Sequence, residues 1–179
     1  MSNFRRSLMS SSAETREYEF ELNDYTLDGN NWIDTGLFPY NSGKNFEIET
    51  IVNATKYNFG YTSYLVSCCD MYVNSREVYR GFRLLFDGSA NSRFYFSLLS
   101  GSDYSNYYTG EVTYKYIYKN GIEYVYVNNN LVVTNTRTIT TSHSLKIGVG
   151  NYEEWEKFKT MEERKWHGTI KHFHLKYLE

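Results

Sequence analysis

Short runs in which apolar and polar residues alternate, separated by glycines, occupy most of this 179-residue sequence. In the run 46–52, every second residue is apolar or threonine, so these side chains would share one face of a strand. Glu47 and Glu49 would lie on the other face. The runs 82–86 and 94–98 alternate in the same way. Many short strands separated by turn residues are typical of an all-β sandwich or barrel.

Asn120 and Gly121 predict the clearest turn of the chain, because this dipeptide suits the positive φ angles of a type I′ turn. With these two residues as the loop, Ile117 would pair with Tyr124. The tyrosines of 114–126 would then occupy both faces of the hairpin.

Aromatic content and charge narrow the class of protein further. The chain has 19 tyrosines and 11 phenylalanines but a single proline, which favours half-buried, pleated strands. The net charge is −2, so no basic field favours nucleic acid. No apolar run approaches the roughly 20 residues that span a bilayer. We expect no nucleic-acid partner and no membrane insertion.

The two cysteines, Cys68 and Cys69, are adjacent in the sequence. Neighbouring Cα atoms lie closer than disulfide geometry prefers, so we expect no bridge between them. On an extended strand they would point to opposite faces, and we expect one buried residue and one near-surface thiol.

Three segments occur in a fixed order. They are Asp-Gly-Asn-Asn-Trp-Ile-Asp-Thr-Gly at 28–36, Tyr-Val-Asn-Asn-Asn-Leu-Val at 126–132, and Leu-Lys-Ile-Gly at 145–148 followed by Gly-Thr-Ile-Lys-His-Phe-His-Leu at 168–175. This order resembles the concanavalin A-like, laminin-G-like jelly roll, found in lectins, glycanase relatives and bacteriophage surface proteins. The resemblance implies an all-β, two-sheet antiparallel jelly-roll sandwich over residues 17–179. It leaves the function open, because the fold carries binders, enzymes and structural modules.

The last of these segments also predicts a local irregularity. Ile170, Phe173 and Leu175 are apolar at offsets of three and then two, which breaks strict alternation and indicates a β-bulge. The closing strand of the laminin-G-like pattern has the same offset.

Two segments do not fit the sandwich. Residues 151–164 are charged, and we predict a short helical or irregular insertion there, with Trp155 and Phe158 as candidate contact residues. Residues 1–16 lack periodicity, and we expect them to form an extended N-terminal arm.

The arm contains a short segment, 4–9, that resembles an N-terminal signature of structural proteins from phages and prophages of gut bacteria. Such an arm could dock on a neighbouring subunit and become ordered on binding. Its candidate partner-binding residues are Phe4, Arg5, Arg6, Leu8 and Met9. Serines and acidic residues follow the two arginines instead of an apolar segment, so we expect no signal peptide and synthesis in the host cytoplasm.

Glu17, Glu19 and Glu21 would share one face of a strand. Concanavalin A-like glycanases place a nucleophile and an acid on such a row. Here the row precedes the first recognisable motif and lacks the mixed Glu/Asp pattern of those enzymes. We therefore interpret it as a solvated strand face and assign no catalytic residue.

His172 and His174 would also share a strand face, where two imidazoles could ligate a metal. The sequence shows no third ligand at a compelling position, so we expect them on the exposed face of an edge or outer strand. Asp70, Asp87 and Asp103 are loop candidates for calcium, but none forms a recognisable calcium loop. We assign neither a metal nor a cofactor.

The segment 103–108 combines three tyrosines with small polar residues. This composition is typical of loops that contact glycans or proteins, with Tyr104, Tyr107 and Tyr108 as candidate contact residues. The alternative is that these tyrosines pack over a sheet edge.

Together these features predict a non-enzymatic virion protein of a tailed bacteriophage, such as a capsid decoration, head fibre or tail appendage. The arm would bind other virion proteins, and the aromatic residues would contact host glycans. A carbohydrate-binding lectin module outside a virion is the main alternative, and a glycoside hydrolase is a third. Self-association into a homo-oligomer is left open.

Overall fold

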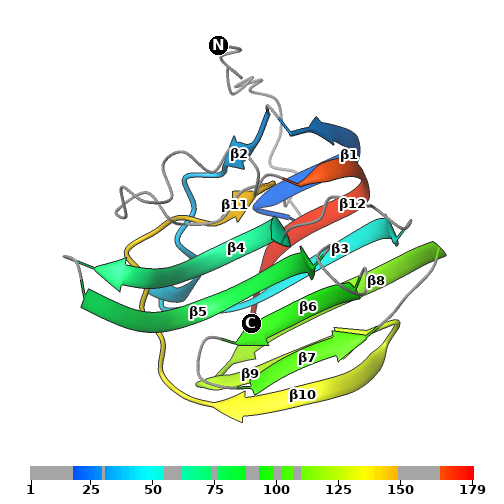
Figure 1. Ribbon diagram of the computed structural model, residues 1–179. Coiled ribbons are helices and arrows are strands. Elements are labelled where there is room, and N and C mark those ends of the chain that lie inside the picture. The colour runs from blue at the N-terminus through cyan, green and yellow to red at the C-terminus, as the bar shows by residue number, and fades with distance from the viewer. Residues whose placement is uncertain are drawn as a thin grey trace, which may run out of the picture.

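Two sheets packed face to face form the molecule, as the alternating runs predict (Figure 1). This computed structural model describes residues 18–29, 31–54, 62–73, 76–87, 93–98, 102–106, 110–148 and 166–179. All pairings between strands are antiparallel, which confirms the all-β jelly-roll sandwich. The predicted arm, 1–16, and the predicted insertion, 151–164, lie outside the described residues.

Sheet A contains both ends of the described chain. Its strand order is β1-β12-β3-β8-β9-β10. These strands are β1 (Phe20–Asp28), β12 (His167–Leu178), β3 (Asn45–Ala54), β8 (Gly110–Lys119), β9 (Ile122–Val127) and β10 (Asn130–Thr136). The C-terminal strand β12 lies between β1 and β3, so it is an interior strand of the sheet.

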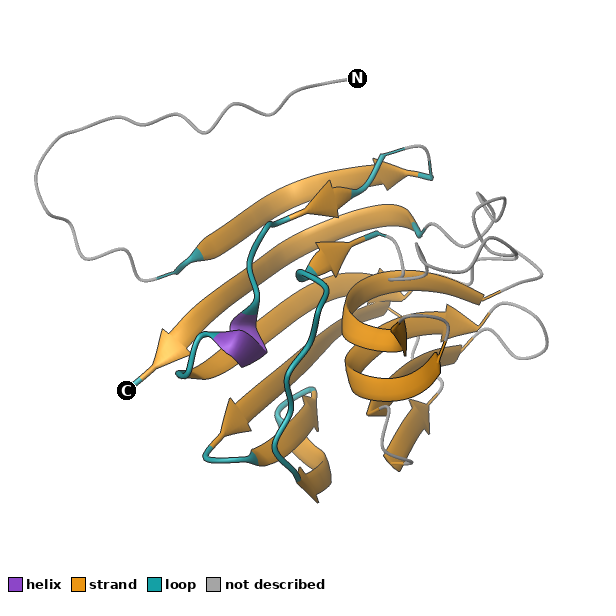
Figure 2. Cartoon of the chain, turned by 90° about the vertical axis from the view of Figure 1, so that its left-hand side faces the viewer, coloured by secondary structure: helices purple, strands orange, loops and turns teal. Residues whose placement is uncertain are grey.

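Sheet B has the strand order β2-β11-β4-β5-β6-β7. Its strands are β2 (Ile33–Asp34), β11 (Lys146–Ile147), β4 (Thr62–Val73), β5 (Arg76–Asp87), β6 (Arg93–Leu98) and β7 (Ser102–Asn106). A 3₁₀ turn, η1 (Pro39–Asn41), lies between β2 and β3 and is drawn purple in Figure 2. The extended segment 137–145 joins β10 of sheet A to β11 of sheet B.

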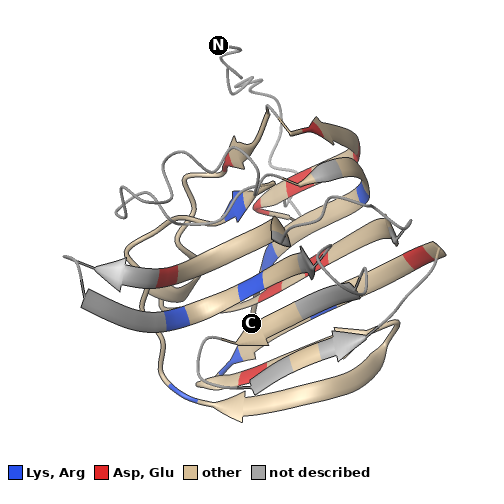
Figure 3. Ribbon diagram, viewed as in Figure 1, with Lys and Arg blue, Asp and Glu red and all other residues tan. Residues whose placement is uncertain are grey.

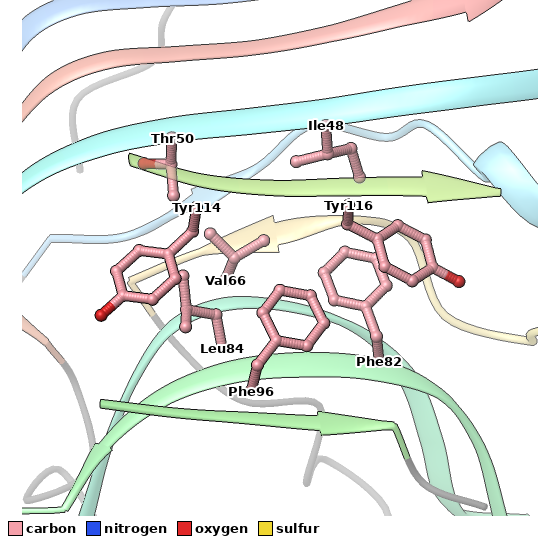
Figure 4. Close-up of a pocket in the computed structure, with 8 residues that line it drawn as sticks. All are labelled: Ile48, Thr50, Val66, Phe82, Leu84, Phe96, Tyr114 and Tyr116. Carbon is pink, nitrogen blue, oxygen red and sulfur yellow. The ribbon is translucent and has the colours of Figure 1, made fainter. Parts of the chain in front are cut away.

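The core fills the space between the two sheets. The predicted inward face of β3, over 46–52, is buried throughout. Phe82 of β5 stacks on Tyr116 of β8 with ring centroids 4.3 Å apart, and on Phe96 of β6 at 5.5 Å. Figure 4 shows these side chains pointing toward one another around a cavity of about 10 Å³. Such a cavity holds about one water molecule and is too small for a sugar.

The predicted hairpin is confirmed in turn and register. Asn120 and Gly121 have φ angles of 53° and 76°, as a type I′ turn requires. Ile117 pairs with Tyr124 across β8 and β9. The predicted bulge in β12 is confirmed as well, because the pairing of β12 with β3 shifts between Ile170 and His172.

Both cysteine side chains are buried, so the expectation of one near-surface thiol is wrong. Cys68 joins the core, and Cys69 lies on the opposite face of β4. Every described side chain of 63–70 is buried, because β4 is an interior strand covered on both faces. Burial raises the pKa of Cys69 to about 12, so its thiol is not ionised at neutral pH.

A buried carboxylate links the two sheets. Glu123 of β9 is 0% exposed and accepts hydrogen bonds from Tyr116 Oη at 2.8 Å, Arg137 Nε at 2.8 Å and Asn135 Nδ2 at 2.9 Å. Arg137 also donates through Nη2 to the carbonyl of Gly81 in β5, at 2.9 Å. One arginine therefore connects sheet A, the segment 137–145 and sheet B.

We expect Glu123→Gln to lower the free energy of unfolding by about 3–5 kcal/mol, because removing one partner leaves a buried charge without compensation. Urea denaturation of the full chain measures this change. The matched control is Glu111→Gln, which removes an exposed ion pair with Lys171 and should leave the midpoint unchanged. Equal midpoints for the two variants would contradict a role for Glu123 in holding the sheets together.

Candidate functional site

The outward face of sheet B carries a row of polar side chains that crosses its strands. Lys146 of β11 pairs with Asp34 of β2 on one side and with Ser67 of β4 on the other. Ser67 pairs with Arg83 of β5, which in turn pairs with Ser97 of β6. Residues that pair across antiparallel strands point to the same face, so these side chains form one line, the sheet B row.

Burial makes this row unusual. Ser67 is 0% exposed, Lys146 is 2% exposed and Ser97 is buried, while Arg83 is partly exposed. Polar groups are costly to bury unless they are paired. Arg83 contacts Tyr64, with its Nη1 3.5 Å from the tyrosine oxygen and its guanidinium 5.9 Å from the ring centroid, a cation–π geometry.

An exposed aromatic ring stands at one end of the row. Trp32 is 40% exposed, and Lys146 Nζ lies 5.5 Å from its ring centroid. The turn that precedes Trp32 is held by two reciprocal hydrogen bonds. Asn31 Oδ1 accepts from the backbone of Asp28 at 2.8 Å, and Asp28 Oδ1 accepts from the backbone of Asn31 at 3.0 Å. This pair explains why the motif begins with Asp-Gly-Asn-Asn immediately before the tryptophan.

Two positive charges converge on this face. Cys69 lies on the same side of β4, and the cations of Arg83 and Lys146 lower its pKa against the stronger effect of burial. A thiol with a pKa near 12 is a poor nucleophile. Besides this thiol, the row contains two cations, the serine hydroxyls and the carboxylate of Asp34.

The predicted tyrosine loop is partly strand. Ser102–Asn106 forms β7, where Tyr104 pairs with Phe96 and is half-buried against the core. The loop expectation is therefore wrong for 103–106, because this segment adds an edge strand to sheet B. A ligand contact by Tyr104 stays a prediction. Tyr107, Tyr108, Trp155 and Phe158 lie outside the described residues, as do the arm residues Phe4, Arg5, Arg6, Leu8 and Met9.

Asp70 is a structural anchor in β4 and not a loop residue. Its buried carboxylate accepts hydrogen bonds from the backbone of Ser142 at 2.7 Å and of His143 at 3.2 Å, and it contacts His143 Nδ1 at 2.8 Å. Burial raises the pKa of Asp70, but the bonds from His143 and Ser142 outweigh burial and lower it below 3.8. Asp87 and Asp103, the other loop candidates, lie in β5 and β7.

The remaining acidic and histidine candidates lie on the outward face of sheet A. Glu19 and Glu21 are exposed, which agrees with a solvated row, and Glu17 lies outside the described residues. His174 is 4% exposed on an interior strand, so the expectation of an exposed histidine is wrong for it. Among the described residues, one group could hold a metal ion: Glu49, His172 and His174.

Sequence reasoning did not single out Arg83, Lys146 or Trp32. Trp32 and Lys146 were inside recognised motifs, and Arg83 occupied the polar position of an alternating run. The missing information was the register that aligns β11, β4 and β5.

No protein-family model matches the sequence, and no curated protein matches it either. Several solved structures share its fold. The NanB sialidase from Streptococcus pneumoniae matches with a TM-score of 0.57 and 16% identity over 91% of this chain and 27% of that chain. This chain therefore spans about a quarter of the sialidase.

Two smaller structures match over most of their own length. The CBM40 domain of the Ruminococcus gnavus IT-sialidase, bound to α2,3-sialyllactose, has a TM-score of 0.50 and 12% identity, over 90% of this chain and 94% of that chain. Domain 4 of AbnA, an extracellular arabinanase from Geobacillus stearothermophilus, was determined in complex with arabinotriose. It matches with a TM-score of 0.50 and 16% identity, over 85% of this chain and 68% of that chain. At these identities the likeness shows the fold.

Two further observations concern partners. Figure 3 shows acidic and basic residues interspersed over the strands in that view. In the part of the chain that the structure describes, no helix has the length and apolar character needed to cross a membrane.

The lowered pKa of Asp70 makes a pH-dependent prediction. A carboxyl group whose pKa is lower in the folded state contributes stability above its unfolded pKa, and this contribution disappears as the pH falls through the folded value. We expect Asp70→Asn to be less stable than the wild type at neutral pH, with a difference that shrinks below about pH 4. Thermal unfolding across this range measures it, and a difference that is constant with pH would contradict the assignment.

Proposed function

We propose that this chain is a non-catalytic carbohydrate-binding module, and that the outward face of sheet B binds an acidic glycan. The observation that carries the proposal is the convergence of Arg83, Lys146 and Trp32 on one face of a sandwich. The two structures of similar size described above support it, because each was determined with a bound oligosaccharide.

The groups on this face suit such a ligand. A guanidinium can bind a sugar carboxylate through two parallel hydrogen bonds, and an ammonium adds a second positive charge. Ser67, Ser97 and Lys146 flank Arg83 or Trp32 in this row but are buried, so direct contact with a ligand would fall to Arg83 and Trp32. The exposed ring of Trp32 offers an apolar surface on which a sugar ring can stack. Entry of the ligand would bring it first to Trp32 and Arg83, the exposed and partly exposed members.

A binding role is favoured over glycoside hydrolysis. A retaining glycosidase needs two carboxyl groups roughly 5 Å apart on either side of the scissile bond. The described carboxyl groups of the predicted acidic row are solvent-exposed, and Glu21 accepts a hydrogen bond from Asn23 at 3.0 Å. These contacts are typical of a solvated strand face.

The virion role remains a separate prediction. It depends on the arm, 1–16, which lies outside the described residues. A carbohydrate-binding module can also serve a virion, so the binding of purified arm-containing protein to phage particles tests that prediction independently of glycan binding.

We expect Arg83→Ala to weaken binding of 3′-sialyllactose roughly 10–100-fold, the loss typical of a hydrogen bond to a charged group. Trp32→Ala should also weaken binding, through loss of the stacking surface. Isothermal titration calorimetry measures both, with lactose as the neutral comparison ligand. The matched control is Arg80→Ala, which removes an exposed arginine of the same strand.

Unchanged affinity in Arg83→Ala and Trp32→Ala would contradict the proposed face. If Tyr107→Ala and Tyr108→Ala abolish binding instead, the ligand is bound by the tyrosine segment that the sequence predicts. If an array of acidic and neutral glycans stays silent for the wild type, the carbohydrate-binding function itself is overturned.

A further inference from the structure

A pair of histidines lies on the outward face of sheet A, with one ring nitrogen of each facing the other. His172 and His174 project from the interior strand β12, and His172 Nε2 lies 3.0 Å from His174 Nδ1. Tyr18 stacks on the His174 ring with centroids 4.5 Å apart. Because β12 is held between β1 and β3, the two rings stand on a rigid part of the fold.

The remaining ring nitrogens both face acceptors. His172 Nδ1 lies 2.8 Å from Asn23 Oδ1, and His174 Nε2 lies 3.1 Å from Glu47 Oε1. The orientation of the Asn23 amide is fixed, because its Nδ2 donates to Glu21 Oε1 at 3.0 Å. Carboxylate and amide oxygens only accept hydrogen bonds, so both of these nitrogens must carry a proton.

This assignment determines the state of the two nitrogens that face each other. A neutral imidazole has one N–H, so His172 Nε2 and His174 Nδ1 would each present a lone pair. In this arrangement both lone pairs are available to a metal ion.

A carboxylate completes a set of three ligands. Glu49 of β3 pairs with His174 in the register of the sheet. One of its carboxylate oxygens and one ring nitrogen of each histidine all lie within 4.8 Å of one another. Lys115 Nζ forms an ion pair with Glu49 Oε2 at 2.7 Å, which holds the carboxylate on this face.

We propose that His172, His174 and Glu49 form a binding site for a divalent transition-metal ion of the zinc class. Two imidazole nitrogens with one carboxylate oxygen are a ligand set that zinc accepts, with a fourth position left for water or a ligand from a partner. Ligating histidines normally donate their other N–H to a carboxylate or carbonyl oxygen. Asn23 and Glu47 supply these acceptors.

The charges around the site are compatible with a cation. Three carboxylates face the two rings from the flanking strands, and two lysines contact two of those carboxylates. The carboxylates are Glu21 of β1 and Glu47 and Glu49 of β3, and the lysines are Lys115 of β8 and Lys176 of β12. These five groups sum to one negative charge. Imidazole binds a metal ion in its deprotonated form, so binding should weaken as the pH falls.

The site is partly open to solvent. The side chains of His172 and Glu49 are 23% and 17% exposed, so an ion can enter without unfolding of the sheet. The sheet B row lies on the other outward face of the sandwich. The metal site is therefore independent of the proposed glycan face, and either proposal can fail without the other.

The test is calorimetric titration of zinc chloride into chelator-treated, full-length protein near neutral pH. The expected result is a single strong site. His172→Asn and Glu49→Gln should each weaken it at least tenfold, and Asn23→Ala roughly 10–100-fold through loss of the orienting acceptor. The matched control, His167→Asn, removes another histidine of β12 and should bind zinc as the wild type does.

Two further readouts separate a metal site from a structural histidine pair. The affinity for zinc should fall as the pH is lowered, because protons compete with the metal ion for the imidazole nitrogens. Bound cobalt should give visible absorption bands that His172→Asn abolishes. Circular dichroism checks folding, and if His174→Asn does not fold, the more exposed His172→Asn decides the result.

Absence of zinc binding by the wild type would overturn the proposal. Equal zinc affinity in the wild type and His172→Asn would also overturn it.

Discussion

The buried carboxylate of Glu123 is the interaction on which the sandwich depends. It places a negative charge between two apolar sheets, where only a full set of hydrogen bonds makes burial tolerable. Arg137 supplies the opposite charge and extends to a backbone carbonyl of β5. That carbonyl belongs to Gly81, at which an added Cβ would lie 2.1 Å from the carbonyl oxygen of Cys68. Glycine is therefore required where the two sheets are joined.

The outward faces of the two sheets carry separate groups of polar side chains. On sheet B, the register of short and long strands aligns cations with hydroxyl groups, beside the exposed ring of Trp32. On sheet A, the same kind of register aligns carboxylates of β3 with histidines of β12. In both cases the proposed binding groups lie on neighbouring strands instead of in a loop. The backbone ladder beneath them would limit the ordering of side chains that binding needs.

Local patterns in the sequence were enough for the strands, the type I′ turn at Asn120 and the bulge near Ile170, because each is determined by residues close together in the chain. The two rows could not be predicted in this way. Ser67 and Arg83 become neighbours through the register of the consecutive strands β4 and β5, and Lys146 joins them through pairing with β11, which is far away in the sequence. For the same reason, the sequence did not indicate that the carboxylates of β3 lie next to the histidines of β12. The tyrosines and small polar residues of 103–108 predicted a loop, but Ser102–Asn106 forms the edge strand β7.

Binding of an acidic glycan by the outward face of sheet B can be tested by titrating ¹⁵N-labelled protein with 3′-sialyllactose and following the amide chemical shifts. We expect shifts concentrated at Trp32, Lys146 and Arg83 and their neighbours in β2, β11, β4 and β5, with little change in sheet A. Shifts confined to sheet A or to 103–108, or the same response to lactose, would contradict it.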